Sequence, residues 1–337
     1  MPQKERVEMR IAECGMRIER PDNPKSTIRN PHFPYVSVVV PVFNGAGTIA
    51  ECLQSLLAQA YPRDRYDVIV VDNHSTDETA SIIKQHPVRY VFEGEIQSSY
   101  AARNRGIREA QGDLIASTDA DCVASPQWIA QGVAAFTTEQ VGGVAGAIRP
   151  REPRTIAQRY AVAKGMLSQE TALQENSFRP AVYTANAFYR KTVLEQAGMF
   201  DPTVKSGGDA DLAWRVQERL HLAITFAPEA IVYHKHRERV SELLRQRKNY
   251  GYGSVLNYLK YQDRMGRRTL KHAYWELASF GRKCGRFLKS VGAYTLTLGR
   301  GARWGDQAAI EGLDVLAFLA KKAGQLEAAV KNRVWYF

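Results

Sequence analysis

The sequence predicts an α/β fold, a mostly parallel sheet flanked by helices, with a basic helical appendage at its C-terminal end. Three observations lead to this prediction. Apolar runs alternate four times with helix-like segments over residues 36–118, as in parallel sheets with helices on their faces. Acidic clusters follow two of these runs. Basic residues gather in the last hundred positions, and 337 residues suffice for a large core.

The front half supplies the clearest elements. Residues 36–42 (VSVVVPV) are continuously apolar, as expected for a parallel strand covered on both faces. Ile49, Leu53, Leu56 and Leu57 recur at helical spacing and predict a helix over 48–60. The other expected strands are 67–71, 88–92 and 113–118, and the other expected helices are one ending at Gln85 and one over 98–110.

The back half is less regular and contains more glycine. We expect helices over 126–136 and 156–170, strands over 141–148, 181–189 and 231–233, and a helix that begins at Asp209 after two glycines.

Two carboxylates, Asp119 and Asp121, end the strand at 113–118. In extended backbone, residues two apart point to the same side, so both acids should face one spot. Paired carboxylates repel unless a proton or a cation lies between them, and a hard divalent ion that also bridges substrate phosphates suits oxygen ligands. The alternative is a solvated turn, where Asp is common.

A second pattern indicates a different function, dinucleotide binding. Gly45-Ala46-Gly47-Thr48-Ile49-Ala50 fits the dinucleotide-binding pattern G-x-G-x-x-G/A, and Asp67 or Asp72 lies at about the expected distance. However, the preceding strand contains Pro41, and Phe43-Asn44 intervene before the first glycine. A dehydrogenase would also have no evident use for the Asp119/Asp121 pair, so we favour the metal-site interpretation.

The charge is unevenly distributed. Residues 235–337 carry 21 Lys and Arg against 8 Asp and Glu, whereas the rest of the chain carries 25 against 27. A basic segment of this kind favours a polyanionic partner. Phe287, Val291, Tyr294 and Leu298 share one helical face, and Ile310, Leu313, Ala317 and Ala320 share another.

These patterns predict amphipathic helices on an anionic membrane surface, where a lipid-linked acceptor would be accessible. Packing of the same helices against the α/β domain or a second subunit is the alternative, and the oligomeric state stays open. Nucleic acid is not expected, because no recognised motif or stacking platform accompanies the charge.

Cysteine usage and the N-terminal residues bear on the compartment. Four scattered cysteines lack metal or disulfide spacing, which suits a reducing environment: Cys14, Cys52, Cys122 and Cys284. We expect neither a signal peptide nor a membrane-spanning run, and hence a cytoplasmic, peripheral protein. The expected division is a lead-in at 1–34, an α/β domain at 35–240 and a basic helical region at 241–337.

Several motifs in order resemble those of the family 2 glycosyltransferases of the GT-A fold. They are VSVVVPVFNGAGTI, VIVVDNHSTDET, AARNRGIREAQGDLIASTDAD, YTANAFYRKTVLEQAGMFDP and GGDADLAWRV, and the match covers about 36–236. The resemblance implies a nucleotide-diphosphate-sugar donor, a divalent ion (Mg²⁺ or Mn²⁺) and inversion at the anomeric carbon.

The resemblance also assigns roles to single residues. Asp209 matches the catalytic base, although Gly208 precedes it where the family often has an acid, so Asp211 stays an alternative. The donor-binding positions are Pro41, Asp72, Arg103, Asn104, Asp119 and Asp121. The metal ligands are Asp121, Asp119 and His234, with His236 as the rival of His234.

The sequence thus predicts a metal-dependent, inverting sugar transfer. Residues 246–250 (QRKNY) only loosely resemble the Q-x-x-R-W signature of processive members, so transfer of one or a few sugars is expected. Arg247 and Lys248, beside an expected flexible segment at 250–253, would close over the diphosphate or form a solvated basic loop. The alternatives are a nucleotidyltransferase on a similar sheet and a non-catalytic lipid- or polyanion-binding protein.

Overall fold

The computed structural model describes residues 33–174, 178–296 and 302–336, and Pro34–Phe337 form one compact unit. Residues 1–32 of the expected lead-in, Cys14 among them, and Leu298 lie outside the described residues. The boundary expected near residue 240 stays a prediction.

The first strands form a parallel sheet, as predicted. The strand order over the described residues is β3-β2-β1-β4-β7-β6-β8-β5, and β3, β2, β1 and β4 run parallel. The elements of this half are β1 Val36–Val42, α2 Ile49–Leu57, β2 Tyr66–Asp72, α3 Thr79–Lys84, β3 Arg89–Phe92, α4 Ser99–Glu109 and β4 Leu114–Thr118, with a short 3₁₀ turn, η1, at Arg63–Arg65.

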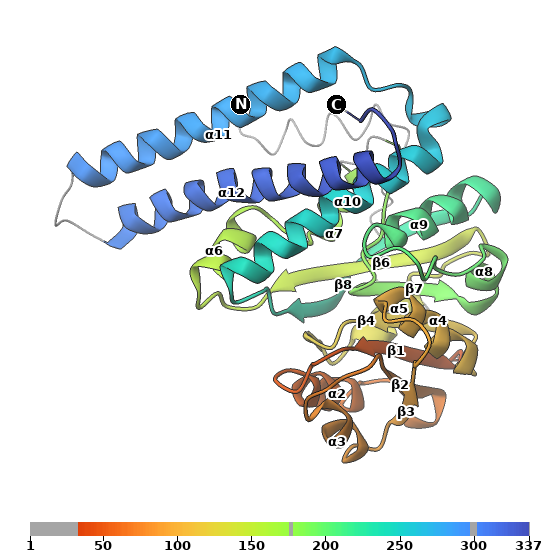
Figure 1. Ribbon diagram of the computed structural model, residues 1–337. Helices are drawn as coiled ribbons and strands as arrows, with labels where there is room; N and C mark the ends of the chain where they lie inside the picture. Colours follow the sequence, from red (N-terminus) through yellow and green to blue (C-terminus); the bar gives the residue numbers. More distant parts are fainter. Residues whose placement is uncertain (1–32, 175–177, 297–301, 337) are drawn as a thin grey trace, which may run out of the picture. The chain divides into compact units, whose positions relative to one another are not determined.

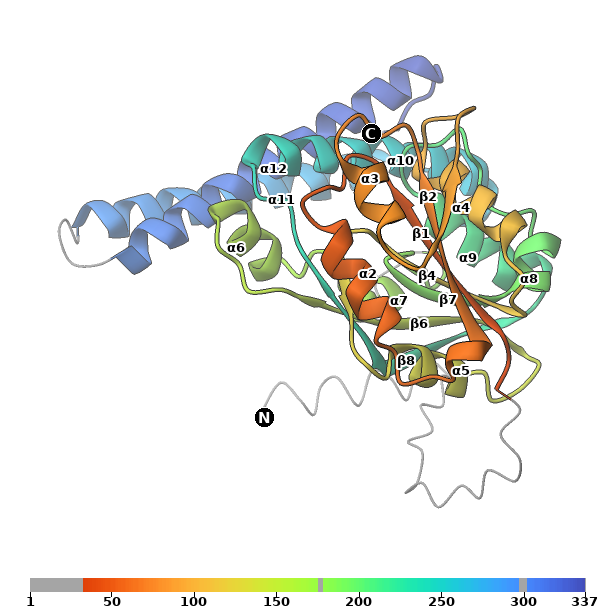
Figure 2. The same cartoon turned by 90° about the horizontal axis from the view of Figure 1, so that it is seen from below.

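Alternate residues of β1 face two separate cores. Val38 and Val40 pack with α2 on one face, whereas Val39 packs with α4 on the other, and Figure 2 shows these helices on opposite sides of the strands. Burial on both faces explains why the run is continuously apolar. The carboxyl ends of β1 and β4 therefore open at the same edge, where Asp119 and Asp121 follow.

The second half of the sheet is mixed. Strand β7 pairs antiparallel with β4 and β6, β8 pairs parallel with β6, and β5 pairs antiparallel with β8. The elements are β5 Cys122–Ala124, α5 Trp128–Ala134, β6 Val141–Pro150, α6 Ile156–Ala163, α7 Gln169–Gln174, β7 Asn186–Arg190, α8 Lys191–Gln196, α9 Gly208–Arg219 and β8 Ala223–His234.

Three predicted elements differ in extent. The helix expected over 156–170 is divided into α6 and α7, because Gly165 and Leu167 adopt positive φ between them. The strand expected from Ala181 begins only at Asn186, and the short strand expected at 231–233 is the end of the longer β8.

Three long helices complete the chain: α10 Val240–Met265, α11 Leu270–Leu296 and α12 Ala302–Lys331. Figure 1 shows α12 between α10 and α11. The predicted stripe of α12 packs on the rest of the protein, since Leu313 and Ala317 are buried with Tyr160 of α6 and Leu243 of α10. Phe287 of α11 lies against Gly312 of α12. None of the described helices is long and apolar enough to cross a membrane.

The segment at 250–253 was expected to be flexible, but it forms the middle of α10. Its glycines allow close contact. A Cβ on Gly251 would lie 2.0 Å from the Lys321 carbonyl oxygen, and a Cβ on Gly324 would lie 1.9 Å from the Lys248 carbonyl oxygen. Gly253 similarly lies against the backbone of Ser206, just before α9. Helix α10 is thus held between α12 and the loop that leads into α9.

This contact generates a stability prediction. Gly324→Val should lower the free energy of unfolding by about 1–3 kcal/mol, because the added side chain must displace the backbone of α10. Gly285→Ala is the matched control: a Cβ there meets nothing within 4 Å, and alanine favours helix by about 0.5–1 kcal/mol. Thermal unfolding measures both. An unchanged melting temperature in Gly324→Val would show that the helices do not cross as described.

Candidate active site

Asp119 is held by an arginine from the neighbouring helix. Arg103 Nη2 lies 2.5 Å from Asp119 Oδ1, and the same guanidinium donates to the Ser99 carbonyl oxygen and to Ser117 Oγ. Arg103 is only 4% exposed, whereas the Asp119 side chain is partly accessible. A charge-assisted bond from so constrained a donor fixes the carboxylate's orientation.

Asp121 lies beside the end of β8. Pairing of Cys122 with His234 brings His234 Nε2 to 3.4 Å from Asp121 Oδ1, and Arg237 Nη1 lies 3.8 Å from Asp121 Oδ2. His234 Nδ1 is buried and has no hydrogen-bond partner among the described residues. The ring of His236 lies 4.9 Å from that of His234, and burial, aided by the His234 and Arg237 charges, lowers the pKa of His236 to about 4.

Asp209 occupies the first turn of α9. The backbone turns into this helix at Gly207, which has a φ of +85°. Tyr100 of α4 donates its hydroxyl to Asp209 Oδ1 at 3.3 Å and accepts from the Gly208 nitrogen at 3.0 Å. Burial raises the pKa of Asp209, while the Arg103 charge and the Ala210 N–H oppose the shift. A carboxylate with a raised pKa holds a proton more readily, which suits a general base.

Asp211 has a different environment. It is buried, and it accepts from Arg215 Nε at 3.0 Å, from the Tyr261 hydroxyl at 2.8 Å and from Lys260 Nζ at 2.6 Å. Burial alone would raise its pKa, but the Lys260 and Arg215 charges outweigh burial and lower it. Asp211 therefore links α9 to α10, and the geometry favours Asp209 as the reactive acid.

Gly208 explains the departure from the expected acid before Asp209. A Cβ at this position would lie 2.9 Å from the Tyr100 ring. A longer side chain would displace Tyr100 and with it the hydrogen bond to Asp209. The tyrosine therefore occupies the space that an acidic side chain would need.

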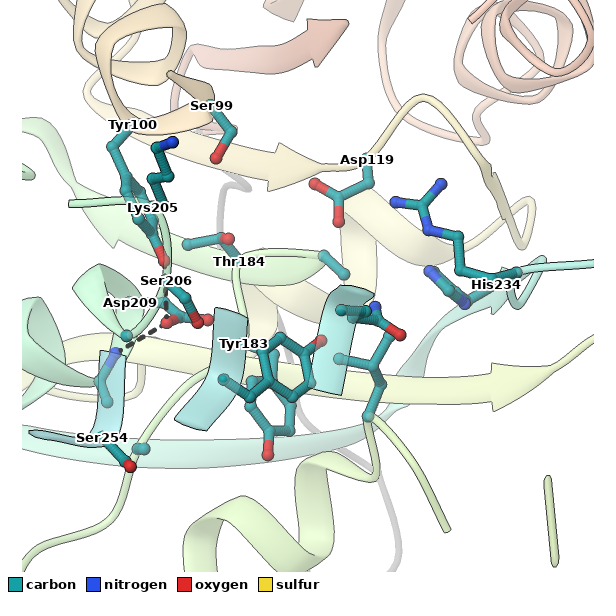
Figure 3. A pocket seen from close by; sticks show the side chains of 18 of the residues that line it. Ser99, Tyr100, Asp119, Tyr183, Thr184, Lys205, Ser206, Asp209, His234 and Ser254 are labelled. Carbon is teal, nitrogen blue, oxygen red and sulfur yellow. Dashed lines mark hydrogen bonds between the residues drawn. The ribbon is translucent and has the colours of Figure 1, made fainter. Parts of the chain in front are cut away.

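One large cavity, of about 1450 Å³, connects these groups. It is lined by five predicted site residues besides Asp209, namely Pro41, Arg103, Asp119, Asp121 and His234. Figure 3 shows Asp209 and Tyr100 on one side of it, and Asp119 and His234 on the other. The cavity also borders the C-terminal helices, through Tyr250, Ser254 and Lys321 among others.

Two predicted donor-binding residues do not line this cavity. Asp72 accepts from the Ser75 nitrogen and the Tyr90 hydroxyl, both at 3.0 Å, and is 2% exposed. Asn104 exchanges two hydrogen bonds with the backbone of Phe200. Both side chains are engaged in holding loops near the site, and their predicted contact with a donor stays a prediction.

Tyr100, Lys205 and Arg237 also line the cavity but were not predicted from the sequence, and Tyr250, another lining residue, was considered only as part of the 246–250 signature. One signal could have identified Tyr100. It lies three residues before Arg103, so both project from one face of α4, in its first turns at the carboxyl edge of the sheet.

Comparison with known proteins relates this site to sugar transfer. The profile of "Glycosyl transferase family 2" matches residues 37–198. "Glycosyltransferase AglE" of Haloferax volcanii is 35% identical over 255 residues, 73% of this chain and 81% of the relative. "Pre-mycofactocin glycosyltransferase" of Mycobacterium tuberculosis is 27% identical over 89% of this chain and 65% of its own length.

A solved structure shares the fold. The mannosyltransferase PcManGT from Pyrobaculum calidifontis, in complex with GDP-Man and Mn²⁺, superposes with a TM-score of 0.59 and 21% identity. The match covers 88% of each chain, and so extends over most of the three C-terminal helices as well as the sheet.

Proposed function

Because the chain belongs to glycosyl transferase family 2 and is a glycosyltransferase that uses nucleotide-sugar donors, we propose that it transfers one or a few sugars with inversion in a metal-dependent, non-processive reaction. One observation carries this proposal: Asp209 lines the same cavity as the Asp119/Asp121 pair, although it comes from a distant part of the chain. A nucleotidyltransferase would need no base at Asp209, and a polyanion-binding protein would need no such convergence.

Asp209 is proposed as the base. The acceptor hydroxyl gives its proton to the Asp209 carboxylate as its oxygen attacks the anomeric carbon, and the bond from that carbon to the diphosphate breaks. The nucleoside diphosphate leaves with the bonding electrons from the opposite face, so the configuration inverts. Tyr100 holds the carboxylate in place through its hydrogen bond to Oδ1.

The residues near Asp121 fit a divalent ion. Among the described residues, no three His, Cys, Asp or Glu side chains form a metal-binding group. Mg²⁺, however, commonly binds one or two carboxylates and completes its shell with substrate phosphates and water, and the related mannosyltransferase structure contains Mn²⁺. Asp121 and His234, 3.4 Å apart, would supply the protein ligands. When bound, the ion neutralises charge on the diphosphate leaving group.

The remaining predicted residues receive more specific roles. Pro41 would lie against the nucleotide base, since it lines the cavity beside Asn44 and Gly45. Arg103 would act mainly by holding Asp119, its partner at 2.5 Å. Asp72 and Asn104 would act indirectly, through the loops that they stabilise. Gln246 and Tyr250 of the loosely matched signature also line the cavity, and we keep the proposal of non-processive transfer.

Replacement of the proposed base gives the first functional test. Asp209→Asn should lower kcat about 10²–10⁴-fold, because no carboxylate is then present to accept the proton of the acceptor hydroxyl. The donor dissociation constant should stay within about twofold, since the leaving-group contacts are intact. Single-turnover kinetics with nucleotide sugars, and calorimetry for donor binding, measure the two effects. Retained turnover would remove Asp209 as the base.

Substitution at the proposed metal site gives the second functional test. Asp121→Asn should raise the Mn²⁺ concentration for half-maximal activity at least about tenfold, because a neutral amide is a poorer ligand than a carboxylate. Chelation of the metal should abolish activity in the wild-type protein. Asp306→Asn, at a half-exposed position of α12 whose carboxylate pairs with Arg159, is the charge-matched control. Full activity after chelation would contradict metal dependence.

We also propose that α11 rests on an anionic membrane. Leu270, Tyr274, Leu277 and Leu288 recur at helical spacing and are 64–79% exposed. This exposed stripe differs from the face predicted through Phe287, which packs against α12. Lys271, Arg282 and Lys289 lie beside the exposed stripe on the same helix. Apolar side chains bordered by cations are typical of interfacial helices, and such a position would give access to a lipid-linked acceptor.

The membrane proposal predicts a specific loss of binding. The double substitution Leu270→Gln/Leu277→Gln should reduce partitioning onto vesicles of phosphatidylcholine with about 30% phosphatidylglycerol by at least tenfold. The reason is that two apolar side chains would no longer be buried in the membrane. Added salt should weaken wild-type binding. Ile96→Gln is the control, because Ile96 is an exposed apolar residue outside the basic helical region at 241–337. Equal cosedimentation of all three proteins would refute the proposal.

A further inference from the structure

Cations gather where the C-terminal helices close one end of the cavity. We call Arg247 of α10, Arg268 of the α10–α11 connection and Lys321 of α12 the tail cluster. Arg268 and Lys321 line the cavity, while Arg247 lies on α10 next to the lining residue Gln246. This cluster belongs to a part of the chain beyond the motif match, and the proposed reaction does not use it.

The tail cluster is only partly balanced by negative charge. Glu276 pairs with Arg268 at 2.8 Å and also with Lys322. Within the described residues, neither Arg247 nor Lys321 has a carboxylate at ion-pairing distance, and the Nε atoms of Arg247 and Arg268 are buried without an acceptor. Buried charges in proteins are ordinarily paired, so donors left in this state are suited to an anionic ligand.

The electrostatics of Lys321 agree with this geometry. Burial lowers the pKa of Lys321, and the charges of Arg247, Lys322 and Arg268 lower it further, with Glu276 in opposition. A bound anion would relieve this repulsion. Such a cluster costs stability in the free protein and favours the bound state.

The position of the cluster separates it from the proposed metal site. Figure 3 shows Ser254 on the opposite side of Asp209 from Asp119 and His234. Ser254 Oγ accepts from Gln325 Nε2 at 3.3 Å and lies 3.5 Å from the Tyr336 hydroxyl, and Arg268 stacks 4.3 Å from the centre of the Tyr336 ring. Asp209 therefore lies between the donor side and the side that leads to the tail cluster.

We infer that the tail cluster binds a phosphate or diphosphate group of the acceptor. This inference rests on the proposed function, because an acceptor whose hydroxyl meets the donor at Asp209 would extend towards Arg268 and Lys321. Guanidinium and ammonium groups together suit phosphate oxygens, and Tyr258, Met265 and Tyr336 supply apolar surface beside them. The phosphate could belong to a lipid carrier or to a soluble acceptor.

Calorimetry on the full chain tests the inference with farnesyl phosphate, farnesol and inorganic phosphate as probes. Lys321→Gln should weaken binding of farnesyl phosphate at least about tenfold, because one charge-assisted contact is lost. Lys321→Arg should retain it. Arg108→Gln removes an equal charge from an exposed position in the last turn of α4 and should change binding by less than about twofold. The melting temperature of Lys321→Gln should not fall, since the substitution relieves repulsion.

The probes distinguish the source of the phosphate. Binding of farnesyl phosphate much tighter than that of inorganic phosphate or farnesol supports a lipid-linked acceptor, and equal binding of both phosphates supports a soluble one. The inference is overturned if no phosphate probe binds the wild-type protein, or if Lys321→Gln binds farnesyl phosphate normally. It is also overturned if Lys321→Gln weakens the binding of GDP or UDP as much as the binding of farnesyl phosphate, because the cluster would then bind the donor. Slow donor hydrolysis by the wild-type protein, which needs no acceptor, tests the proposed function separately.

Discussion

The site depends on the first turns of α4, which hold two carboxylates at once. Arg103 fixes Asp119 at the end of β4, and Tyr100 fixes Asp209 at the start of α9. Hydrogen bonds to charged groups are worth about 1.5–3 kcal/mol each, and an unpaired buried arginine would cost more. Stacking of Tyr100 on Phe200, at 5.5 Å between ring centres, keeps the tyrosine in place. The parallel and mixed parts of the sheet are thereby joined at the point where chemistry is proposed.

Environment gives chemically identical acids different roles. Asp121 lies beside a histidine and an arginine at the cavity wall. Asp209 faces the cavity with one tyrosine and a backbone N–H as partners, so burial dominates and its pKa rises. Asp211, two residues later, meets two cations that hold its pKa low. The helical geometry of α9 points Asp209 and Asp211 in different directions, which separates the proposed base from the acid that links α9 to α10.

The sequence predicted those features that depend on local pattern. Strand β1 was predicted with its observed bounds because burial on both faces leaves a continuous apolar run, and Asp119 and Asp121 follow β4 as predicted. They lie in a turn, in which the Cys122 N–H donates to the Asp119 carbonyl oxygen, and not in the extended backbone from which we expected both to face one spot. Contacts between distant segments were not predictable in this way. Tyr100 and Asp209 are 109 residues apart, and nothing in either local sequence specifies their pairing. The glycines of α10 were expected to form a flexible segment. Their close contacts with α12 and Ser206 form only in the folded chain, so the local sequence does not indicate them. Likewise, the tail's charge predicted an anionic partner, but only the fold separates the exposed stripe of α11 from the cations that line the cavity.

If Asp209 accepts the proton of the acceptor hydroxyl while the hydroxyl oxygen attacks from the side opposite the diphosphate, the configuration at the anomeric carbon must invert. The stereochemistry of the product is therefore the most direct test. With an α-linked nucleotide sugar as donor, we expect a β-linked product, visible as a large coupling constant of the anomeric proton in the NMR spectrum of a gluco-configured sugar. An α-linked product would show that the configuration is retained and would exclude Asp209 as the base of a single inverting displacement.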